Sequence, residues 1–200
     1  MARTFYRFVS YLSYPGFMAV LGVLHFAPGP LSLTLSLLGY VLIPLLFAGW
    51  MIRTGRVQSL EMKTAPERNL AYRVSLVLDL LLAIYFHWRW QGETAQWPWV
   101  VFGVILLLTL VNQWGFKASM HTAACAGLLA FSFSWVINHF GIEALVFSPP
   151  MQLYLGSLTL IFALIYLSRF RLGAHSHREL LSGTAIGLFV TFALQLIWNL

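Results

Sequence analysis

The sequence contains few charged residues. Only 9% of its 200 residues are Asp, Glu, Lys or Arg, whereas a typical soluble protein has about 25%. Apolar residues make up 60% of the chain, and 12 basic with 6 acidic side chains cannot cover the surface of a soluble fold. This scarcity excludes an ordinary soluble domain and indicates an integral membrane protein.

Cysteine is also scarce, since Cys125 is the only one. A single cysteine excludes an intrachain disulfide and a metal site built on cysteine. Cys125 lies in an apolar segment, where we expect it to be a small packing residue. The sequence has no run of Lys or Arg like those of nucleic-acid-binding arms. We therefore expect no metal, no cofactor and no nucleic-acid partner.

Charge-free apolar segments predict seven transmembrane helices. Residues 8–52 carry no formal charge and are long enough for two helices of about 20 residues. Ala27-Pro28-Gly29-Pro30 predicts a turn between them. The expected spans are about 8–26, 31–52, 70–88, 94–116, 118–142, 144–168 and 180–200. They are rich in leucine and do not alternate as barrel strands do. The prediction is an all-α, polytopic transmembrane helix bundle of about six to seven spans, forming a single domain over residues 1–200.

Basic residues are concentrated on one face of the expected membrane. If the loops alternate, 11 of the 12 basic residues fall on the side of the N-terminus, and only Arg89 falls on the other. The positive-inside rule places the basic face in the cytoplasm. Three polar clusters, residues 61–69, 117–122 and 168–179, interrupt the apolar background on that face. Because two spans separate each cluster from the next, all three can meet at one membrane surface.

These clusters contain cations and a histidine pair suited to a phosphate ester. Lys63, Arg68 and Arg169 could surround a tetrahedral anion, because guanidinium forks and ammonium groups both bind phosphate. His175 and Glu179 are spaced i, i+4, so a helix would place both on one face and let the carboxylate orient the imidazole. The same argument leaves His177 as an alternative imidazole, although Leu181 stands where its acid would be.

The second cluster adds an acid and a phosphate-binding group. His121 stands at the expected start of a helix, where an imidazole could act as a general acid. Ser119 and the backbone amides beside it could bind phosphate oxygens. Together the clusters contain the parts of a phosphate-ester hydrolase with a histidine nucleophile.

At these positions the sequence resembles the type 2 phosphatidic acid phosphatase superfamily. Ser168-Arg169, five residues, His175, three residues and Glu179 resemble its signature S-R-x5-H-x3-D. Ser119-Met120-His121 resembles P-S-G-H, and the segment from Lys63 to Arg68 resembles K-x6-R-P. The resemblance covers residues from about 60 to 185, so we place a phosphatase-like core at about 60–200.

The resemblance implies metal-independent removal of phosphate from a lipid phosphate or polyprenyl diphosphate through a phosphohistidine. It implies that His175 is the nucleophile, Glu179 its orienting acid and His121 the general acid for the leaving alcohol. The implied phosphate ligands are Lys63, Arg68, Ser119 and Arg169. It also suggests a divergent bacterial member in the inner membrane, whose partners are its lipid substrate and the membrane lipids.

The sequence departs from the family pattern in each signature. Glu179 replaces the family's Asp, and Ala118 and Met120 replace Pro and Gly. The first signature is two residues short, and Asn69 follows Arg68 where the family has Pro. These differences leave a second hypothesis open, a catalytically inactive relative that binds anionic lipid or a partner protein.

One carboxylate, Asp79, lies deep within a predicted span. Buried acids in membranes usually face the protein interior and are paired or protonated. An interhelical hydrogen bond is one interpretation. A proton or ion path is the other, and it gives a third hypothesis, a small transporter that uses Asp79.

Overall fold

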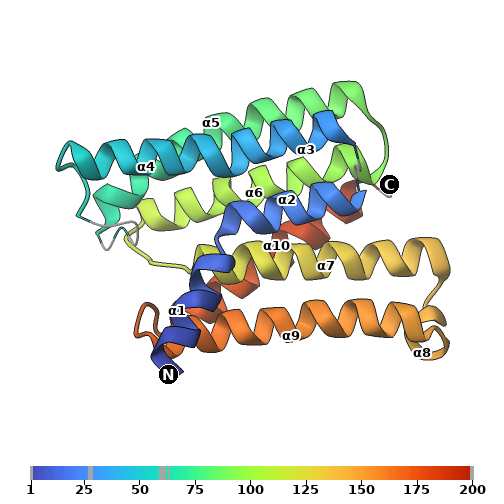
Figure 1. Ribbon diagram of the computed structural model, residues 1–200. Coiled ribbons are helices and arrows are strands. Elements are labelled where there is room, and N and C mark those ends of the chain that lie inside the picture. Colours follow the sequence, from blue (N-terminus) through green and yellow to red (C-terminus); the bar gives the residue numbers. More distant parts are fainter. Residues whose placement is uncertain (1, 27–28, 59–61, 63, 199–200) are drawn as a thin grey trace.

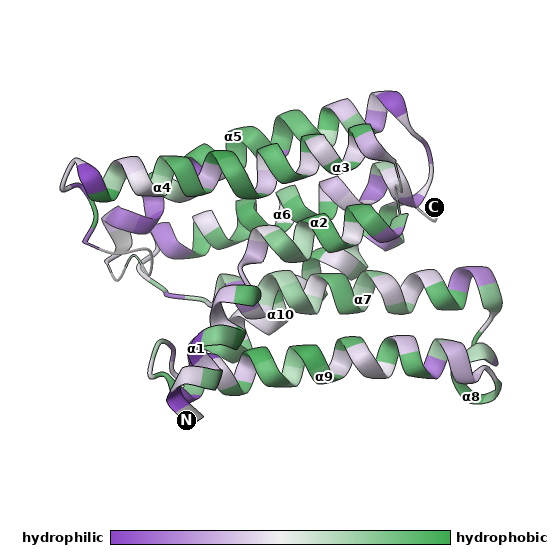
Figure 2. Cartoon of the chain, in the orientation of Figure 1, coloured by the Kyte–Doolittle hydropathy of each residue, from purple (hydrophilic) through white to green (hydrophobic). Residues whose placement is uncertain are grey.

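The computed structural model of the chain describes residues 2–26, 29–58, 62 and 64–198 (Figure 1). Within this part, six helices are long and apolar enough to cross a membrane. They are Pro30–Arg53 (α3, η1 and α4 together), α5 (Ala65–Arg89), α6 (Glu93–Gln113), α7 (Met120–Phe140), α9 (Pro149–Arg171) and α10 (His177–Trp198). The described residues contain no strand. The predicted all-α, polytopic membrane bundle is confirmed, and Figure 2 shows how apolar residues dominate its helices.

The first predicted span is two helices rather than one. α1 (Ala2–Leu12) and α2 (Pro15–Phe26) meet at an angle of 52°. Pro15 cannot donate a helical hydrogen bond, and it disfavours helical geometry at the residue before it. The prediction of one continuous helix over 8–26 is therefore wrong, because the chain bends at residues 13–14.

α1 has the character of a helix that lies at a membrane interface. Phe5, Phe8 and Leu12 follow helical spacing on one side, and all three are exposed. Arg3 and Arg7 are exposed on the same helix. An exposed apolar stripe beside basic residues is typical of helices at the boundary between headgroups and acyl chains.

The next span contains a wide turn. α3 (Pro30–Ser36) leads into a π-helical segment, η1 (Leu37–Leu42), before α4 (Ile43–Arg53). Pro44 has no N–H to donate to the carbonyl of Tyr40, four residues earlier, and its ring crowds that carbonyl. Such a residue favours local widening of a helix. The carbonyl of Tyr40 lies against Gly16 of α2, where a Cβ atom would overlap it.

Glycines at positions 183 and 187 allow α7 and α10 to pack closely. A Cβ atom at Gly183 would overlap the carbonyl oxygen of Ser119, and one at Gly187 would overlap that of Ala123. Thr122 also donates a 2.9 Å hydrogen bond from Oγ1 to the carbonyl of Leu180. Close backbone contact of this kind is usual between membrane helices with small residues.

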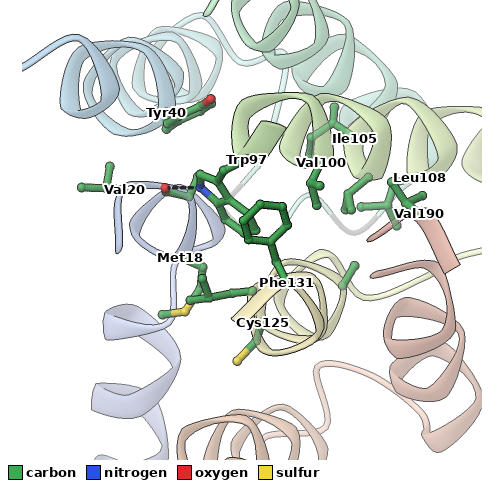
Figure 3. Close-up of a cluster of buried hydrophobic side chains, with 14 of the residues drawn as sticks. Met18, Val20, Tyr40, Trp97, Val100, Ile105, Leu108, Cys125, Phe131 and Val190 are labelled. Carbon is green, nitrogen blue, oxygen red and sulfur yellow. Dashed lines mark hydrogen bonds between the residues drawn. The ribbon is translucent and has the colours of Figure 1, made fainter. Parts of the chain in front are cut away.

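Aromatic and small side chains fill the centre of the bundle (Figure 3). Trp97 of α6 donates a 2.9 Å hydrogen bond from Nε1 to the carbonyl of Ala19 in α2. Phe131 is fully buried beside it, with ring centroids 5.4 Å apart. Cys125 is buried in the same cluster, which confirms its expected packing role.

All three polar clusters lie at one end of the bundle. α5, α7 and α10 begin there, α6 and α9 end there, and α1 lies beside them (Figure 1). We call this the basic end. α10 finishes at the opposite end, near the N-terminus of α6, and the short helix α8 (Ala144–Phe147) lies at that end between α7 and α9.

Candidate functional site

The histidine–carboxylate pair forms as the sequence predicts. His175 lies in the loop between α9 and α10, and its Nδ1 is 3.0 Å from Oε2 of Glu179. The His175 side chain is 10% exposed, while that of Glu179 is 23% exposed. When Nδ1 carries the hydrogen, it donates a hydrogen bond to Glu179. The lone pair of Nε2 is then left for another reaction partner.

Glu179 also organises the start of α10. Its Oε2 accepts a 3.0 Å hydrogen bond from the backbone N–H of Ser176, and its own N–H donates to Oγ of Ser176 at 3.3 Å. This reciprocal pair is a capping box, a motif that prefers Glu or Gln at the third helical position. The capping box therefore gives a local structural reason for Glu at position 179, where the resembled family has Asp.

Lys117 is a third member of this group, and the sequence argument did not assign it to the site. Its Nζ lies 3.5 Å from Oε2 of Glu179 and donates a 3.2 Å hydrogen bond to the carbonyl of Ala174. Lys117 thus ties the α6–α7 connection to the loop that holds His175. Its place two residues before Ser119, inside the second polar cluster, was the available signal.

The surroundings of His175 favour a neutral imidazole. Burial of the ring, reinforced by the positive charges of Arg169 and Lys117, lowers the pKa of His175 from 6.5 to about 4. The hydrogen bond and negative charge of Glu179 offset only part of this effect. At neutral pH the ring therefore has a free nitrogen lone pair, which a nucleophile requires.

Arg169 and His121 lie close to His175. Both Arg169 and His175 are near enough to His121 to interact with it electrostatically. Arg169 lies in the last turn of α9 and is 6% exposed. The structure thus brings together the two histidines and one arginine that the sequence assigned to a phosphate site.

α1 covers this arginine. Nη1 of Arg169 donates a 2.6 Å hydrogen bond to Oγ of Ser10, and Oγ of the neighbouring Ser168 donates to the carbonyl of Tyr6 at 2.8 Å. Ser10 and Tyr6 were not among the predicted site residues. No local pattern marks them, because each reaches its partner only through the packing of α1 on α9.

Ser119 has a structural role at the start of α7. Its side chain is fully buried, and its Oγ accepts a 3.4 Å hydrogen bond from the N–H of Thr122 as a helix cap. Its backbone N–H donates to the carbonyl of Glu179 at 2.9 Å. The second bond joins the start of α7, where His121 lies, to the start of α10, where Glu179 lies.

The first polar cluster joins the α5–α6 pair. Arg68 is buried, and its Nε and Nη1 donate to Oδ1 of Asn112 at 2.9 Å and to the carbonyl of Met62 at 3.2 Å. Asn112 in turn donates to Oδ1 of Asn69. These bonds hold Arg68 between two helices at the basic end. Lys63 lies outside the residues that the structure describes.

The alternative imidazole, His177, has different surroundings. It is exposed, its ring stacks on Phe170 with centroids 3.9 Å apart, and its Nδ1 lies 3.0 Å from the hydroxyl of Tyr166. The carboxylate of Glu179 instead contacts His175. Of the two imidazoles, His175 has the geometry that the chemistry requires.

The described residues contain no group of three or more His, Cys, Asp or Glu side chains arranged to hold a metal ion. No protein-family model, curated protein or solved structure matches the chain.

Proposed function

We propose that this membrane protein hydrolyses a phosphate monoester or diphosphate of a lipid or polyprenol, with His175 as the nucleophile. The observation that carries the proposal is the 3.0 Å contact between His175 and Glu179, made beside Arg169 and His121. A neutral, oriented imidazole next to a guanidinium and a second imidazole is a suitable arrangement for phosphoryl transfer.

In the first step, Nε2 of His175 attacks phosphorus and forms a P–N bond as the P–O bond to the leaving group breaks. The leaving group is the lipid alcohol of a monoester or the lipid monophosphate of a diphosphate. His121, protonated once the negatively charged phosphate lies beside it, donates a proton to the departing oxygen. Glu179 accepts a hydrogen bond from Nδ1–H of His175 and stabilises the positive charge that develops on the ring. Arg169 stabilises the negative charge on the non-bridging phosphate oxygens.

In the second step, water attacks the phosphohistidine. His121, now neutral, accepts a proton from the water as the P–N bond breaks and its electron pair returns to Nε2 of His175. Inorganic phosphate leaves, and both histidines regain their starting protonation states. Both steps balance without a redox partner.

The position of the site suits an amphiphilic substrate. The histidines lie at the basic end of a membrane bundle, where a phosphate headgroup meets water while its tail stays in lipid. Basic residues in the surrounding loops attract anionic headgroups. The positive-inside rule places this end in the cytoplasm, and we assign the protein to a bacterial inner membrane as part of the proposal.

Phosphate release from purified protein tests the function. The protein in detergent micelles is incubated with phosphatidic acid, a sphingoid-base phosphate and a polyprenyl diphosphate, and inorganic phosphate is measured. We expect release from at least one substrate, and a fall of about 10³-fold or more in His175→Ala. His177→Ala is the matched control and should retain activity.

A trapping experiment tests the intermediate. With ³²P-labelled substrate and a rapid acid-free quench, label should remain on the wild-type protein in a form stable to base and labile to acid, as phosphohistidine is. The label should be missing from His175→Ala. Equal labelling of both proteins, or equal activity, would overturn the assignment of His175.

A binding protein without catalysis is the second candidate. The observation that favours it concerns Arg68, one of the implied phosphate ligands. Its guanidinium donates instead to Asn112 and to the carbonyl of Met62 within the α5–α6 pair. A well-folded protein that binds anionic lipid vesicles but releases no phosphate from any of the three substrates would support this candidate. Solute flux in vesicles that depends on Asp79 would instead indicate a transporter.

A further inference from the structure

A cavity that contains a few polar side chains lies inside the bundle, among residues that the proposed phosphatase chemistry does not use. Its volume is about 60 Å³, enough for roughly four to six waters at about 10–15 Å³ each. α2, α5, α6, α7 and the η1–α4 segment all contribute to its lining. Most lining residues are apolar, but four carry oxygen-bearing side chains: Tyr14, Tyr40, Ser75 and Asp79.

Asp79 supplies the negative charge of this cavity. It is 4% exposed and lies midway along α5. Ser75 lies one turn earlier on the same helix, so both side chains face the cavity from one side. Among the residues that the structure describes, no Lys, Arg or His lines the cavity and no ion pair involves Asp79. A carboxylate in this position needs a positive partner or a proton.

Tyr40 provides a second, independent observation. It is 4% exposed, and its hydroxyl is buried without a hydrogen-bond partner among the described residues. A buried hydroxyl without a partner is costly unless a ligand or water supplies one. Tyr40 belongs to the π-helical turn η1, a distortion that often occurs at functional sites. Tyr14 and Tyr40 both interact electrostatically with Asp79, which places their rings close to the carboxylate.

The chemistry of the lining selects the ligand. A carboxylate repels phosphate and other anions, so this cavity is not a second phosphate site. Carboxylate and hydroxyl oxygens are hard ligands that suit metal cations of the alkali and alkaline-earth groups. One carboxylate balances one positive charge, whereas divalent sites usually combine several carboxylates or carbonyls. The volume accommodates a single ion with some of its water.

We propose that this cavity binds one monovalent metal cation, Na⁺ or K⁺, with Asp79 as the charged ligand. The hydroxyl oxygens of Tyr14, Tyr40 and Ser75 are the neutral ligands, and water completes the coordination shell. The ion neutralises Asp79 and links α5 to α2 and to η1. This site is separate from the histidines at the basic end, so cation binding does not depend on the proposed hydrolase activity.

Direct binding and thermal unfolding test the site on the full-length protein in detergent. Binding of ²²Na⁺ or ⁸⁶Rb⁺, a K⁺ substitute, should saturate at one ion per protein. At constant ionic strength, replacing N-methyl-D-glucamine chloride with NaCl or KCl should raise the unfolding midpoint by roughly 5 °C or more at saturation. Whichever salt gives the larger rise identifies the preferred ion.

Three variants locate the site. Asp79→Asn keeps the shape of the side chain and removes its charge, so it should bind the ion at least tenfold more weakly. Tyr40→Phe should also weaken binding, but it should unfold at the wild-type temperature in N-methyl-D-glucamine chloride, because its hydroxyl has no protein partner to lose. His175→Ala should bind the ion as the wild type does, which separates this test from that of the phosphatase.

Two outcomes would overturn the proposal. One is the absence of bound ²²Na⁺ and ⁸⁶Rb⁺ with equal unfolding midpoints in all salts, which would mean that Asp79 is neutralised by a proton. The other is unchanged ion binding in Tyr40→Phe and Asp79→Asn, which would place the ion elsewhere.

Discussion

Arg169 and Ser10 are 159 residues apart in the sequence and are joined by a 2.6 Å hydrogen bond from Nη1 to Oγ. The bond attaches the amphipathic helix α1 to the end of α9, beside the two histidines. An arginine proposed to bind substrate phosphate is thus held by a neutral hydroxyl. A phosphate group at Arg169 would compete with Ser10 or share the guanidinium with it.

Removing that hydroxyl should loosen α1. We expect Ser10→Ala to destabilise the protein by about 1–3 kcal/mol, because a buried bond to a charged donor is lost, and to speed proteolysis within α1. Thermal unfolding and limited proteolysis measure both effects. Ser13→Ala is the matched control, since Oγ of Ser13 donates to the carbonyl of Ser10 within the same segment. Equal effects of the two substitutions would show that the contact with Arg169 contributes little.

Acid should destabilise the protein through His175. Its pKa is about 4 in the folded protein and 6.5 as the ordinary value, so the unfolded chain binds a proton at a higher pH than the folded chain does. Stability is then complete above about pH 6.5 and falls as the pH drops toward 4, by about 1–3 kcal/mol. Unfolding midpoints measured from pH 7.5 to 4.5 should show this loss.

The histidine variants separate this effect from general acid sensitivity. His175→Ala lacks the titrating group, so its midpoint should change less than that of the wild type over the same pH range. His177→Ala should follow the wild type. Parallel curves for wild type and His175→Ala would contradict the assigned pKa.

Lys117 should influence the same titration. Lys117→Met removes a positive charge that lowers the pKa of His175, so this pKa should rise from about 4 toward 6.5. Histidine ¹⁵N chemical shifts followed over pH measure it directly. Arg171→Met is the control, because Arg171 is exposed near the same end and is not among the charges that act on His175. An unchanged titration in Lys117→Met would remove Lys117 from the site.

The packing of α7 on α10 should be sensitive to one methyl group. Gly183→Ala places a Cβ atom against the carbonyl of Ser119, and backbone at a helix contact cannot move aside at low cost. We expect a loss of about 1–3 kcal/mol in stability and reduced phosphate release. Gly156→Ala, where a Cβ atom meets nothing within 4 Å, should be neutral or slightly stabilising. Similar midpoints for the two variants would contradict the close contact.

The helices could be predicted from the sequence because lipid imposes a simple rule. Each span must satisfy its backbone internally over about 20 apolar residues, and gaps between charges reveal such segments. The sequence analysis predicts one helix here, without the bend between α1 and α2, because residues 8–26 carry no formal charge. Pro15, and the basic, amphipathic character of residues 2–12, were the signals for it.

The candidate site could be predicted where its residues fall in recognisable local patterns. His175 and Glu179 belong to one local segment, and Ser176-x-x-Glu179 could also have been recognised as a capping box. Lys117 and Ser10 reach the site through tertiary packing, which no local spacing records. Arg68 is among the predicted phosphate ligands because of its charge. In the structure its Nε donates to Asn112, which lies 44 positions further along the chain.

The opposite placement of α1 and the last turn of α10 has a practical consequence for cellular experiments. A reporter protein fused after α10 would emerge on the side of the membrane away from the histidines. A fluorescent protein that matures only in the cytoplasm, or an enzyme active only outside it, would then reveal the compartment that faces the histidines. A fusion placed before α1 would instead add bulk within a few turns of Ser10 and could disturb the contact with Arg169.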